Sequence, residues 1–338
     1  MKKIFSSLNL PDEVVQRFEA KFGGKLVLEH PEAGKPFARE ELPQKLAESN
    51  GFFGGMLNKD LIDAATNLEI ACSLGAGYDG FDVKYAGEKG IYVMNAPHAT
   101  TEPTSELAIT LMLCVSRKIV NFNQFMKEKG AAAGTSFFIQ DPFATAPAPT
   151  PVHGKTLGIV GLGKIGKAVA KKAQGLGMGI IYYDTFRAST DTEKELNVKY
   201  VEFDELLRTS DYVTLHCLYT AENHHMMGAA QFEMMKPTAY FINAARGKLV
   251  NEQELVDALK AGKILGAALD VYEFEPKVTP ELLEMDNVLL TPHIGTSTFE
   301  SRAGIAHEAL DGMGLYLTGG ECPTIVNKEF YVPRVNPV

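Results

Sequence analysis

Short apolar runs alternate with amphipathic stretches along the second half of the chain. The runs that predict buried strands occupy residues 157–160, 180–183, 212–216, 239–242, 265–269 and 288–291. Helical patterns lie between them, as in Glu252 to Lys260, where Leu255 and Leu259 fall on one face. Strands that alternate with helices predict a parallel sheet with crossover helices. We therefore expect an α/β fold whose second half is a doubly wound parallel sheet.

The first hundred or so residues form a separate α/β unit in this pattern. Its predicted strands lie near Lys2 to Phe5, Leu26 to Leu28, Leu68 to Cys72 and Ile91 to Met94. The end of the chain is periodic through Ile305, Ala309 and Met313, which predicts a helix. We expect this helix to return to the first unit.

A long apolar segment from about Ser105 to Lys129 predicts a helix between the two units. Its run Leu107 to Val115 is hydrophobic on every side, whereas a helix that packs on a single domain needs only one apolar face. We therefore expect this helix to pack across domains or subunits. Gly130 to Pro151 follows, and its four prolines predict an irregular loop.

Three glycines stand where the strand 157–160 turns into the next helix. Gly161 allows a tight turn, Gly163 lets backbone amides approach a pyrophosphate, and Gly166 permits close packing of the helix on the sheet. A phosphate bound there would meet the positive end of the helix dipole. The segment therefore predicts a dinucleotide-binding turn, and the alternative is a tight strand-to-helix turn without a ligand.

A second match to the same glycine pattern, Gly75 to Gly80, shows that the motif needs its context. It also follows an apolar run, but the strand after it ends on Asn95 and supplies no acid. The strand after Gly166 ends at Asp184, 18 residues further on, where the acid that binds the ribose of a dinucleotide belongs. Context therefore favours the later motif as the cofactor turn.

Composition narrows the classes of partner. The 338 residues have room for two domains, and a hydrophobic share of 45% suffices for packed cores. The net charge of −9 argues against nucleic acid, because phosphate neutralisation needs clustered Lys and Arg. The four cysteines are far apart and form no CxxC pair, so we expect no metal site, no disulfide framework and a reducing, cytoplasmic setting. We expect neither a signal peptide nor a membrane span, which takes about 18 unbroken apolar residues.

Three ionisable residues follow predicted strands in the same half of the sheet. Arg246 comes after the strand 239–242, Glu275 after the strand 265–269, and His293 after the strand 288–291. Ligands of such sheets bind outside the carboxyl ends of the strands, so the three side chains should converge on one crevice. Taken singly, Arg246 could form a surface ion pair, Glu275 could be a solvated loop acid, and His293 could cap a helix. Together they predict an active site.

The residues around these three resemble a known family. Asn243 to Glu252, Gly266 to Pro276 and Thr291 to Gly295, in this order after Gly161 to Gly166, look like the signature blocks of the D-isomer-specific 2-hydroxyacid dehydrogenases. The resemblance runs from about Ser73 to Asn327. It implies an NAD-dependent oxidoreductase acting on D-2-hydroxy acids, with Arg246, Glu275 and His293 as its catalytic residues.

The same resemblance implies an architecture. The family has two similar α/β lobes, Rossmann-like and flavodoxin-like, with the cofactor lobe inserted into the substrate lobe. The expected boundaries are residues 1–101 plus 298–338 for the substrate-binding domain and 102–297 for the NAD-binding domain. Family members are usually dimers joined through the cofactor lobe, so we expect a homodimer, a role that would suit the apolar helix beginning near Ser105.

The resemblance also assigns residues to the ligands. Contacts to NAD are expected from Gly161, Gly163, Lys164, Ile165, Gly166, Asp184, Thr104, Cys217, Ala244, Asp270 and Gly295. The small-molecule substrate is expected at Arg246 and at the loop of Gly75, Ala76 and Gly77, whose backbone amides can form an anion-binding nest. Asp270 is expected to orient the nicotinamide carboxamide or its ribose.

Physical chemistry suggests what each catalytic residue could do. Arg246 can grip a substrate carboxylate with two hydrogen bonds. Protonated His293 can donate a proton to a carbonyl oxygen as hydride arrives, and take it back in the oxidative direction. Glu275, hydrogen-bonded to the other ring nitrogen, would fix the tautomer and favour the imidazolium.

Two departures bear on the substrate. Thr101 to Glu106 resembles the version in phosphite dehydrogenases and some glyoxylate reductases, yet phosphite enzymes carry a lysine where this chain has Ala76. Without that cation a monocarboxylate is favoured over a doubly charged oxyanion. Phe52, Phe53 and Met56 fall where relatives line the pocket for the substrate side chain, and the alternative is that they are ordinary core residues.

The leading hypothesis is a D-2-hydroxyacid dehydrogenase that reduces a 2-keto monocarboxylate such as glyoxylate, hydroxypyruvate or pyruvate. Asp184 should make it prefer NADH, although Arg187 lies close by and could weaken this preference. One rival is an NADH-sensing transcriptional corepressor of the same fold, which would need a peptide-binding groove and interaction tails. The other rival is a phosphite dehydrogenase-like oxidoreductase.

Overall fold

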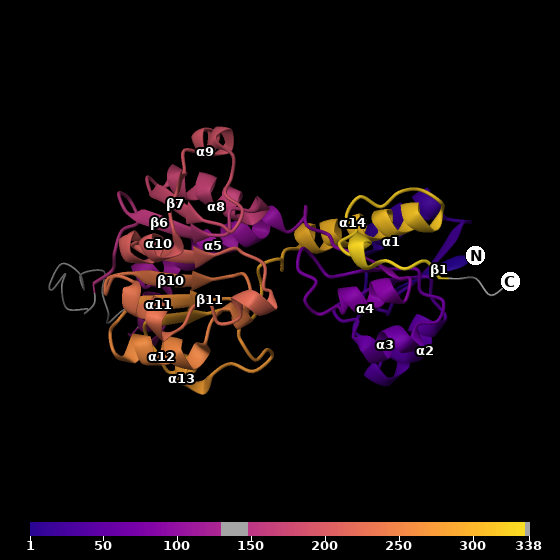
Figure 1. The fold of residues 1–338 in the computed structure, drawn as a ribbon. Helices are drawn as coiled ribbons and strands as arrows, with labels where there is room; N and C mark the ends of the chain where they lie inside the picture. The colour runs from indigo at the N-terminus through magenta and orange to yellow at the C-terminus, as the bar shows by residue number, and fades with distance from the viewer. Residues whose placement is uncertain (130–147, 335–338) are drawn as a thin grey trace. The chain divides into compact units, whose positions relative to one another are not determined.

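The computed structural model describes residues 1–129 and 148–334 of the chain. These residues form two compact α/β units (Figure 1), and the second is inserted into the first. The first unit holds residues 1–100 and 296–338, and the second holds residues 101–295. Most of the loop expected at Gly130 to Pro151 lies outside the described residues.

The first unit is built on a sheet of five parallel strands. They are β1 (Lys2–Ser6), β2 (Leu26–Glu29), β3 (Gly51–Phe53), β4 (Ile70–Cys72) and β5 (Tyr92–Met94). Their order across the sheet is β2-β1-β3-β4-β5, which is the order of flavodoxin-like folds. The sequence pattern predicted every strand here except β3, because Gly51–Phe53 is a short run bounded by glycines.

The core of the first unit decides between the two interpretations of the phenylalanine pair. Phe52 and Phe53 are each 2% exposed and pack on opposite faces of the sheet, whereas Met56 is 38% exposed. The two phenylalanines are therefore core residues. Strand β3 alternates its side chains between the two faces, and both faces are covered, so both rings are buried.

Short helices and one long helix cover this sheet. They are α1 (Asp12–Phe22), η1 (Arg39–Glu41), α2 (Leu42–Ala47), α3 (Lys59–Ala64), α4 (Val83–Glu88), α14 (Phe299–Leu317) and η5 (Lys328–Phe330). The helix predicted through Ile305, Ala309 and Met313 is α14, and it packs against α1 in the core of the first unit. A Cβ at Gly314 would lie 2.5 Å from the Phe22 ring, so this glycine permits the close approach of the two helices.

The second unit is built on a sheet of seven parallel strands. They are β6 (Thr156–Val160), β7 (Gly179–Tyr183), β8 (Lys199–Tyr200), β9 (Tyr212–Leu215), β10 (Tyr240–Asn243), β11 (Gly266–Leu269) and β12 (Val288–Leu290). Their order is β12-β11-β10-β9-β6-β7-β8, so the direction of winding reverses between β6 and β9. Ligands of doubly wound sheets bind at such a switch point. The pattern missed only β8, whose two residues carry no apolar run.

The helices of the second unit enclose its sheet. They are α5 (Thr101–Arg117), α6 (Ile119–Lys129), α8 (Lys164–Gly175), α9 (Thr190–Leu196), α10 (Phe203–Thr209), α11 (Ala229–Met234), α12 (Glu252–Lys260) and α13 (Pro280–Leu283), with the 3-10 turns η3 (Ala221–Asn223) and η4 (Gly247–Leu249). Local sequence sets their ends. The Asn251 side chain, for example, caps α12 by accepting a hydrogen bond from the backbone N–H of Glu254 at 3.1 Å.

The long apolar helix expected at about Ser105 to Lys129 is two helices. The chain breaks at Lys118, whose φ of +52° lies in the left-handed region and ends α5. Helix α5 buries Leu111, Met112 and Val115 in the core of its own unit, together with residues of α8 and the sheet. The apolar character of α5 is therefore explained inside the second unit, and no helix in the described residues is long and apolar enough to cross a membrane.

Candidate active site

The three predicted catalytic residues follow three neighbouring strands. Arg246 follows β10, Glu275 follows β11, and His293 follows β12. These strands are adjacent and parallel, so the three residues come from the same edge of the sheet. The topology thus supplies the convergence that the strand pattern predicted.

Glu275 and His293 form a direct pair. The Nδ1 atom of His293 lies 3.0 Å from one carboxylate oxygen of Glu275 and 3.2 Å from the other. The carboxylate also accepts a hydrogen bond from the backbone N–H of Tyr272 at 3.0 Å, which fixes its position. The carboxylate makes Nδ1 the protonated nitrogen, so Nε2 of His293 is the ring atom available to a substrate.

The pair shifts the pKa of each member. The hydrogen bond to Glu275 raises the pKa of His293, against the opposing effects of burial and of the nearby Arg246 charge. Burial of Glu275 acts to raise its pKa, but the bonds from His293 and Tyr272 prevail and lower it. His293 is therefore favoured in its charged form at a higher pH than a free histidine.

Arg246 is held by the segment that follows β10. The Asn243 side chain, which is buried, donates to the backbone carbonyl of Arg246 at 2.9 Å and accepts from the N–H of Ala245 at 3.0 Å. The Arg246 guanidinium donates to the Ala245 carbonyl at 2.7 Å. Arg246 is half-buried, and its charge acts on both Glu275 and His293, which shows that the three groups share one electrostatic site.

Asp270 builds the loop that carries His293. It is 1% exposed, and its carboxylate accepts from the backbone N–H groups of Ile294 at 2.8 Å and Gly295 at 2.9 Å, and from the Thr291 hydroxyl at 2.6 Å. His293 itself has a φ of +53°, and its N–H donates to the Asp270 carbonyl at 2.8 Å. The described contacts of Asp270 thus position His293, a role that the sequence analysis did not foresee.

The glycine turn lies at the switch point of the sheet. Gly161 follows β6 with a φ of +96°, and a Cβ there would lie 2.6 Å from the backbone nitrogen of Cys217, which follows β9. A Cβ on Gly166 would lie 2.1 Å from the Gly161 carbonyl oxygen, whereas a Cβ on Gly163 would meet no atom within 4 Å. Two glycines are therefore required by the fold, and the third keeps space open at the start of α8, beside Lys164 and Ile165.

Asp184 stands at the end of β7, next to this turn. One oxygen of its carboxylate accepts from the Leu162 N–H at 2.8 Å, and the other accepts from the Phe186 N–H at 3.0 Å. Each carboxylate oxygen has a second lone pair, so the group can still accept from ribose hydroxyls. Together, the open Gly163, the N-terminus of α8 and this acid fit a dinucleotide cofactor.

Arg187, three residues further on, is turned to other partners. Its guanidinium makes two hydrogen bonds to the Glu193 carboxylate, at 2.8 and 3.0 Å, and lies 5.0 Å from the centre of the Tyr200 ring. These bonds, with one from the Tyr182 hydroxyl, lower the pKa of Glu193 to about 2. Arg187 is thus tied to α9 in this structure.

The remaining residues expected at the cofactor lie near the same carboxyl edge. Thr104 in α5 donates to the Gly295 carbonyl at 3.4 Å, so it adjoins the loop of His293. Ala244 follows β10 and is 8% exposed.

His216, between β9 and Cys217, was missed by the sequence analysis. Burial lowers its pKa to about 4, and its Nε2 pairs with the Thr214 hydroxyl at 3.0 Å. His216 is the last residue of the predicted strand 212–216, and an ionisable residue at the carboxyl end of a strand was the signal that could have drawn attention to it.

Gly75, Ala76 and Gly77 belong to the first unit, where they follow β4. The carbonyls of Gly75 and Ala76 accept hydrogen bonds from the N–H of Ala96 at 2.9 Å and from the Asn95 side chain at 2.8 Å. Gly75 has a φ of +144°. The loop is therefore fixed through its carbonyl groups, at the carboxyl edge of its own sheet.

Comparison with known proteins places the chain in a family. The family described as "D-isomer specific 2-hydroxyacid dehydrogenase, NAD binding domain" matches residues 109–295. A Staphylococcus aureus (strain USA300) protein that bears the name "Putative 2-hydroxyacid dehydrogenase" is 45% identical over 246 residues, which cover 73% of this chain and 75% of that protein. The chain belongs to the D-isomer specific 2-hydroxyacid dehydrogenases. It is an oxidoreductase whose cofactor is a nicotinamide dinucleotide.

Solved structures agree with this assignment. The D-mandelate dehydrogenase of Rhodotorula graminis superposes with a TM-score of 0.83 at 30% identity, covering 98% of this chain and 99% of that one. The NADPH-dependent glyoxylate/hydroxypyruvate reductase of Sinorhizobium meliloti, solved with NADP and malonate, gives a TM-score of 0.81 at 27% identity and covers 99% of each chain. The expected α/β fold with two parallel sheets is thus confirmed.

Proposed function

We propose that this protein is an NADH-dependent D-2-hydroxyacid dehydrogenase that works mainly as a reductase of small 2-keto monocarboxylates. Glyoxylate, hydroxypyruvate and pyruvate are the candidate substrates. The observation that carries the proposal is the Glu275–His293 pair beside Arg246, on the same sheet edge as the glycine turn. In this proposal His293 is the proton donor, and Arg246 is the residue that binds the carboxylate of the substrate next to the cofactor.

The proposed mechanism gives each residue one task. Arg246 binds the substrate carboxylate with two parallel hydrogen bonds, which holds the 2-keto carbon in a fixed orientation. The Nε2 atom of His293 donates its proton to the keto oxygen, and Glu275 stabilises the imidazolium until that transfer. The bound cofactor supplies the hydride. In the oxidative direction the neutral His293 accepts the hydroxyl proton.

The proposed preference for NADH depends on Asp184 and Arg187. A 2′-phosphate would bring negative charge against the Asp184 carboxylate, which is unfavourable. Arg187 would be the residue to neutralise that phosphate, but its guanidinium is paired with Glu193. The pairing supports a stronger preference for NADH than the sequence alone suggested.

Residues 1–101 and 298–338 are proposed to form the substrate-binding domain, and residues 102–297 the domain that binds the cofactor. We propose that the amides of Gly75, Ala76 and Gly77 bind the carboxylate of the substrate. Ala76 brings no charge to this loop, which supports a monocarboxylate over phosphite. Phe52 and Phe53 are buried in the core, so we do not propose that they limit the size of the substrate.

One steady-state experiment tests the proposal against its rivals. Oxidation of NADH would be followed with glyoxylate, hydroxypyruvate, pyruvate and a bulkier 2-keto acid, and the reverse reaction with NAD and phosphite. We expect turnover with at least one 2-keto acid, and a loss of about 10²- to 10⁴-fold in His293→Ala with nearly unchanged NADH binding. NADH binding without any turnover would favour the corepressor, and turnover of phosphite alone would favour the phosphite dehydrogenase.

A homodimer in a cytoplasmic setting completes the proposal. Helix α6 exposes Ile119, Val120 and Met126 at 52%, 48% and 46%. An apolar face of this kind on the cofactor-binding unit supports contact with a second copy of the chain. All four cysteines are free thiols, in keeping with a reducing compartment.

A further inference from the structure

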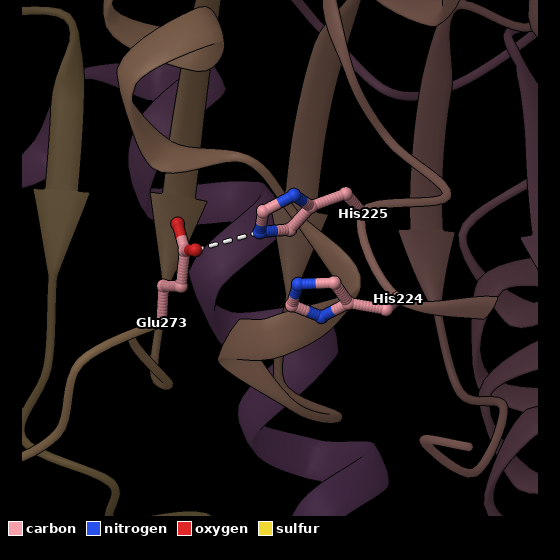
Figure 2. Close-up of side chains that lie close together, drawn as sticks. All are labelled: His224, His225 and Glu273. Atoms are coloured by element: carbon pink, nitrogen blue, oxygen red, sulfur yellow. Dashed lines mark hydrogen bonds and ion pairs between the residues drawn. The ribbon is translucent and has the colours of Figure 1, made fainter. Parts of the chain in front are cut away.

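A cluster of two histidines and a glutamate lies outside the proposed active site. His224 and His225 belong to the loop between η3 and α11, and Glu273 belongs to the loop after β11. One ligand atom from each of the three lies within 4.8 Å of the others. Figure 2 shows the two imidazole rings one over the other, with the Glu273 carboxylate beside them.

We propose that His224, His225 and Glu273 form a binding site for one divalent transition-metal ion of the Zn²⁺ type. Two imidazoles and one carboxylate are a set of ligands that zinc accepts, with solvent in the fourth position. The proposal revises the expectation of no metal site, which rested on the spacing of the cysteines alone. It does not depend on the proposed reaction.

Two of the three ligands are already joined. The Nε2 atom of His225 lies 2.6 Å from a Glu273 carboxylate oxygen. At metal–ligand distances of about 2.0 to 2.1 Å, two ligands of a tetrahedral ion stand about 3.3 Å apart. An ion could therefore replace the shared proton if the ring and the carboxylate separate by well under 1 Å.

The surrounding bonds hold these two ligands in place. His225 has a φ of +55°, and its backbone N–H donates to the Lys248 carbonyl at 3.0 Å. The second oxygen of Glu273 accepts from the N–H of Glu252 at 3.1 Å, and the buried Glu252 carboxylate accepts the N–H of Glu273 at 2.6 Å. The two loops are thus fixed before any ion arrives, and hydrogen bonds around the ligands strengthen a metal site.

The third ligand, His224, is exposed, so its ring has room to turn toward an ion. Its ring stacks on that of His225 with centroids 3.7 Å apart. Its Nδ1 atom lies 3.4 Å from the Tyr219 hydroxyl, which leaves Nε2 for an ion. Stacked rings do not aim both nitrogens at one point, so the His224 ring must turn toward the ion, and its exposure permits this.

The test is a direct measurement of metal binding on the full chain after treatment with a chelator and desalting. Zn²⁺ affinity would be measured by competition with a chromophoric chelator. We expect one Zn²⁺ per chain at a Kd of about 10 μM or tighter, and His224→Ala and His225→Ala should each weaken binding about tenfold or more. Bound Co²⁺ should give the visible absorption of a tetrahedral ion in the wild type and not in His224→Ala.

Two control variants separate this site from others on the same chain. His98→Ala removes a histidine that is paired with Glu308 in the first unit, and His293→Ala removes the catalytic histidine. Both should keep wild-type Zn²⁺ affinity. His225→Ala could disturb the loops, so the decisive variant is His224→Ala, which changes an exposed residue. Its melting temperature in the absence of metal should equal that of the wild type.

Three outcomes would overturn the proposal. They are the absence of saturable Zn²⁺ binding up to about 100 μM, binding that survives in both His224→Ala and His225→Ala, and binding that is lost in His293→Ala instead.

Discussion

His293 has an unfavourable backbone conformation at the position of the proposed proton donor. A left-handed conformation in a residue other than glycine costs about 1 to 3 kcal/mol, and His293 holds one at a φ of +53°. Hydrogen bonds from Thr291, Ile294 and Gly295 to the buried Asp270 carboxylate offset this strain. The conformation brings Nδ1 to Glu275. The strained backbone of His293 thus places its ring beside Glu275, as the proposed role of His293 as proton donor requires.

Glu275→Gln should move the pH dependence of keto-acid reduction. Glu275 raises the pKa of His293, so in the wild type the protonated donor persists to higher pH and is lost as the pH rises through the raised pKa. Removing the negative charge lowers that pKa, and the alkaline limb of kcat/KM should shift to lower pH. The profile should be measured from pH 5 to 10 with Glu281→Gln as a matched control. Identical alkaline limbs in the two variants would show that Glu275 does not tune His293.

Arg246→Lys should disable recognition of the substrate carboxylate. Lysine keeps the charge but loses the planar fork that binds two oxygens at once. A lost charge-assisted hydrogen bond is worth about 1.5 to 3 kcal/mol, so kcat/KM should fall by about tenfold or more.

The control for this change is Arg208→Lys. Arg208 is an exposed arginine of α10 in the same unit, where it is paired with Asp204. NADH binding, followed by fluorescence titration, should stay intact in both variants. Wild-type kcat/KM in Arg246→Lys for all three candidate substrates would make Arg246 structural and direct attention to the Gly75–Gly77 loop.

The cofactor turn is an element in which neighbouring glycines meet different demands. Gly161 sits against the backbone of Cys217, whereas Gly163 faces open space. The first supports the packing of β6 against the loop after β9, and the second is proposed to admit the cofactor. Substitution by alanine can separate the two demands.

Gly161→Ala should destabilise the fold by about 1 to 3 kcal/mol, because the residue has a φ of +96° and its Cβ would lie 2.6 Å from a backbone nitrogen. Gly163→Ala should leave the melting temperature close to that of the wild type, since its φ is −71° and no atom lies near the added Cβ. Its NADH affinity should nevertheless fall about tenfold or more. Full NADH affinity in Gly163→Ala would contradict the assignment of this turn to the pyrophosphate.

Helix α9 carries Glu193, which holds the arginine that could otherwise neutralise the 2′-phosphate of NADPH. Glu193→Gln removes the charge that holds the half-exposed Arg187 through two hydrogen bonds, so the ratio of kcat/KM for NADPH to that for NADH should rise by about two- to fivefold. Glu195→Gln, an exposed change in the same helix, controls for the altered charge. An equal rise in both variants, or no rise in either, would show that Arg187 is not restrained by Glu193.

Each of the two units has its own core, and we propose that the apolar side chains exposed on α6 contact a second copy of the chain. Val120→Glu should convert a dimer into a monomer, because a charge at the centre of an apolar contact between two chains is left without compensation. Light scattering after size exclusion would report twice the mass of one chain for the wild type and the mass of one chain for the variant. Val27→Glu places the same charge on a valine of the first unit that is 41% exposed and should leave the mass unchanged. A monomeric wild type would end the proposal.

Much of this protein was determined by short stretches of sequence. A buried strand needs an apolar run, and a tight turn onto a helix needs glycine, so the strands that flank the sites and the turn at Gly161 could be predicted from local pattern. The order of Arg246, Glu275 and His293 after successive strands was enough to predict that they share an edge. Strand β3 was not predicted because its short run is bounded by glycines, and β8 was not predicted because its two residues form no apolar run.

The partners of each side chain were decided only by the tertiary structure. Asp270 proved to hold the loop of His293, Arg187 proved to bind Glu193, and His225 met Glu273 across 47 intervening positions. A single sequence does not reveal the contacts of Asp270 and His225, because parallel strands bring together residues that are distant along the chain. Nor does it decide which of the acids near Arg187 in the sequence its guanidinium contacts. The apolar helix after Ser105 shows the same limit, since Lys118 divides it and the sheet of its own unit covers α5. Local sequence determined the helices and strands, and tertiary packing determined their contacts. The reason is that buried polar groups need hydrogen-bond partners and buried apolar groups need close packing, and both are supplied by whatever the fold brings side by side.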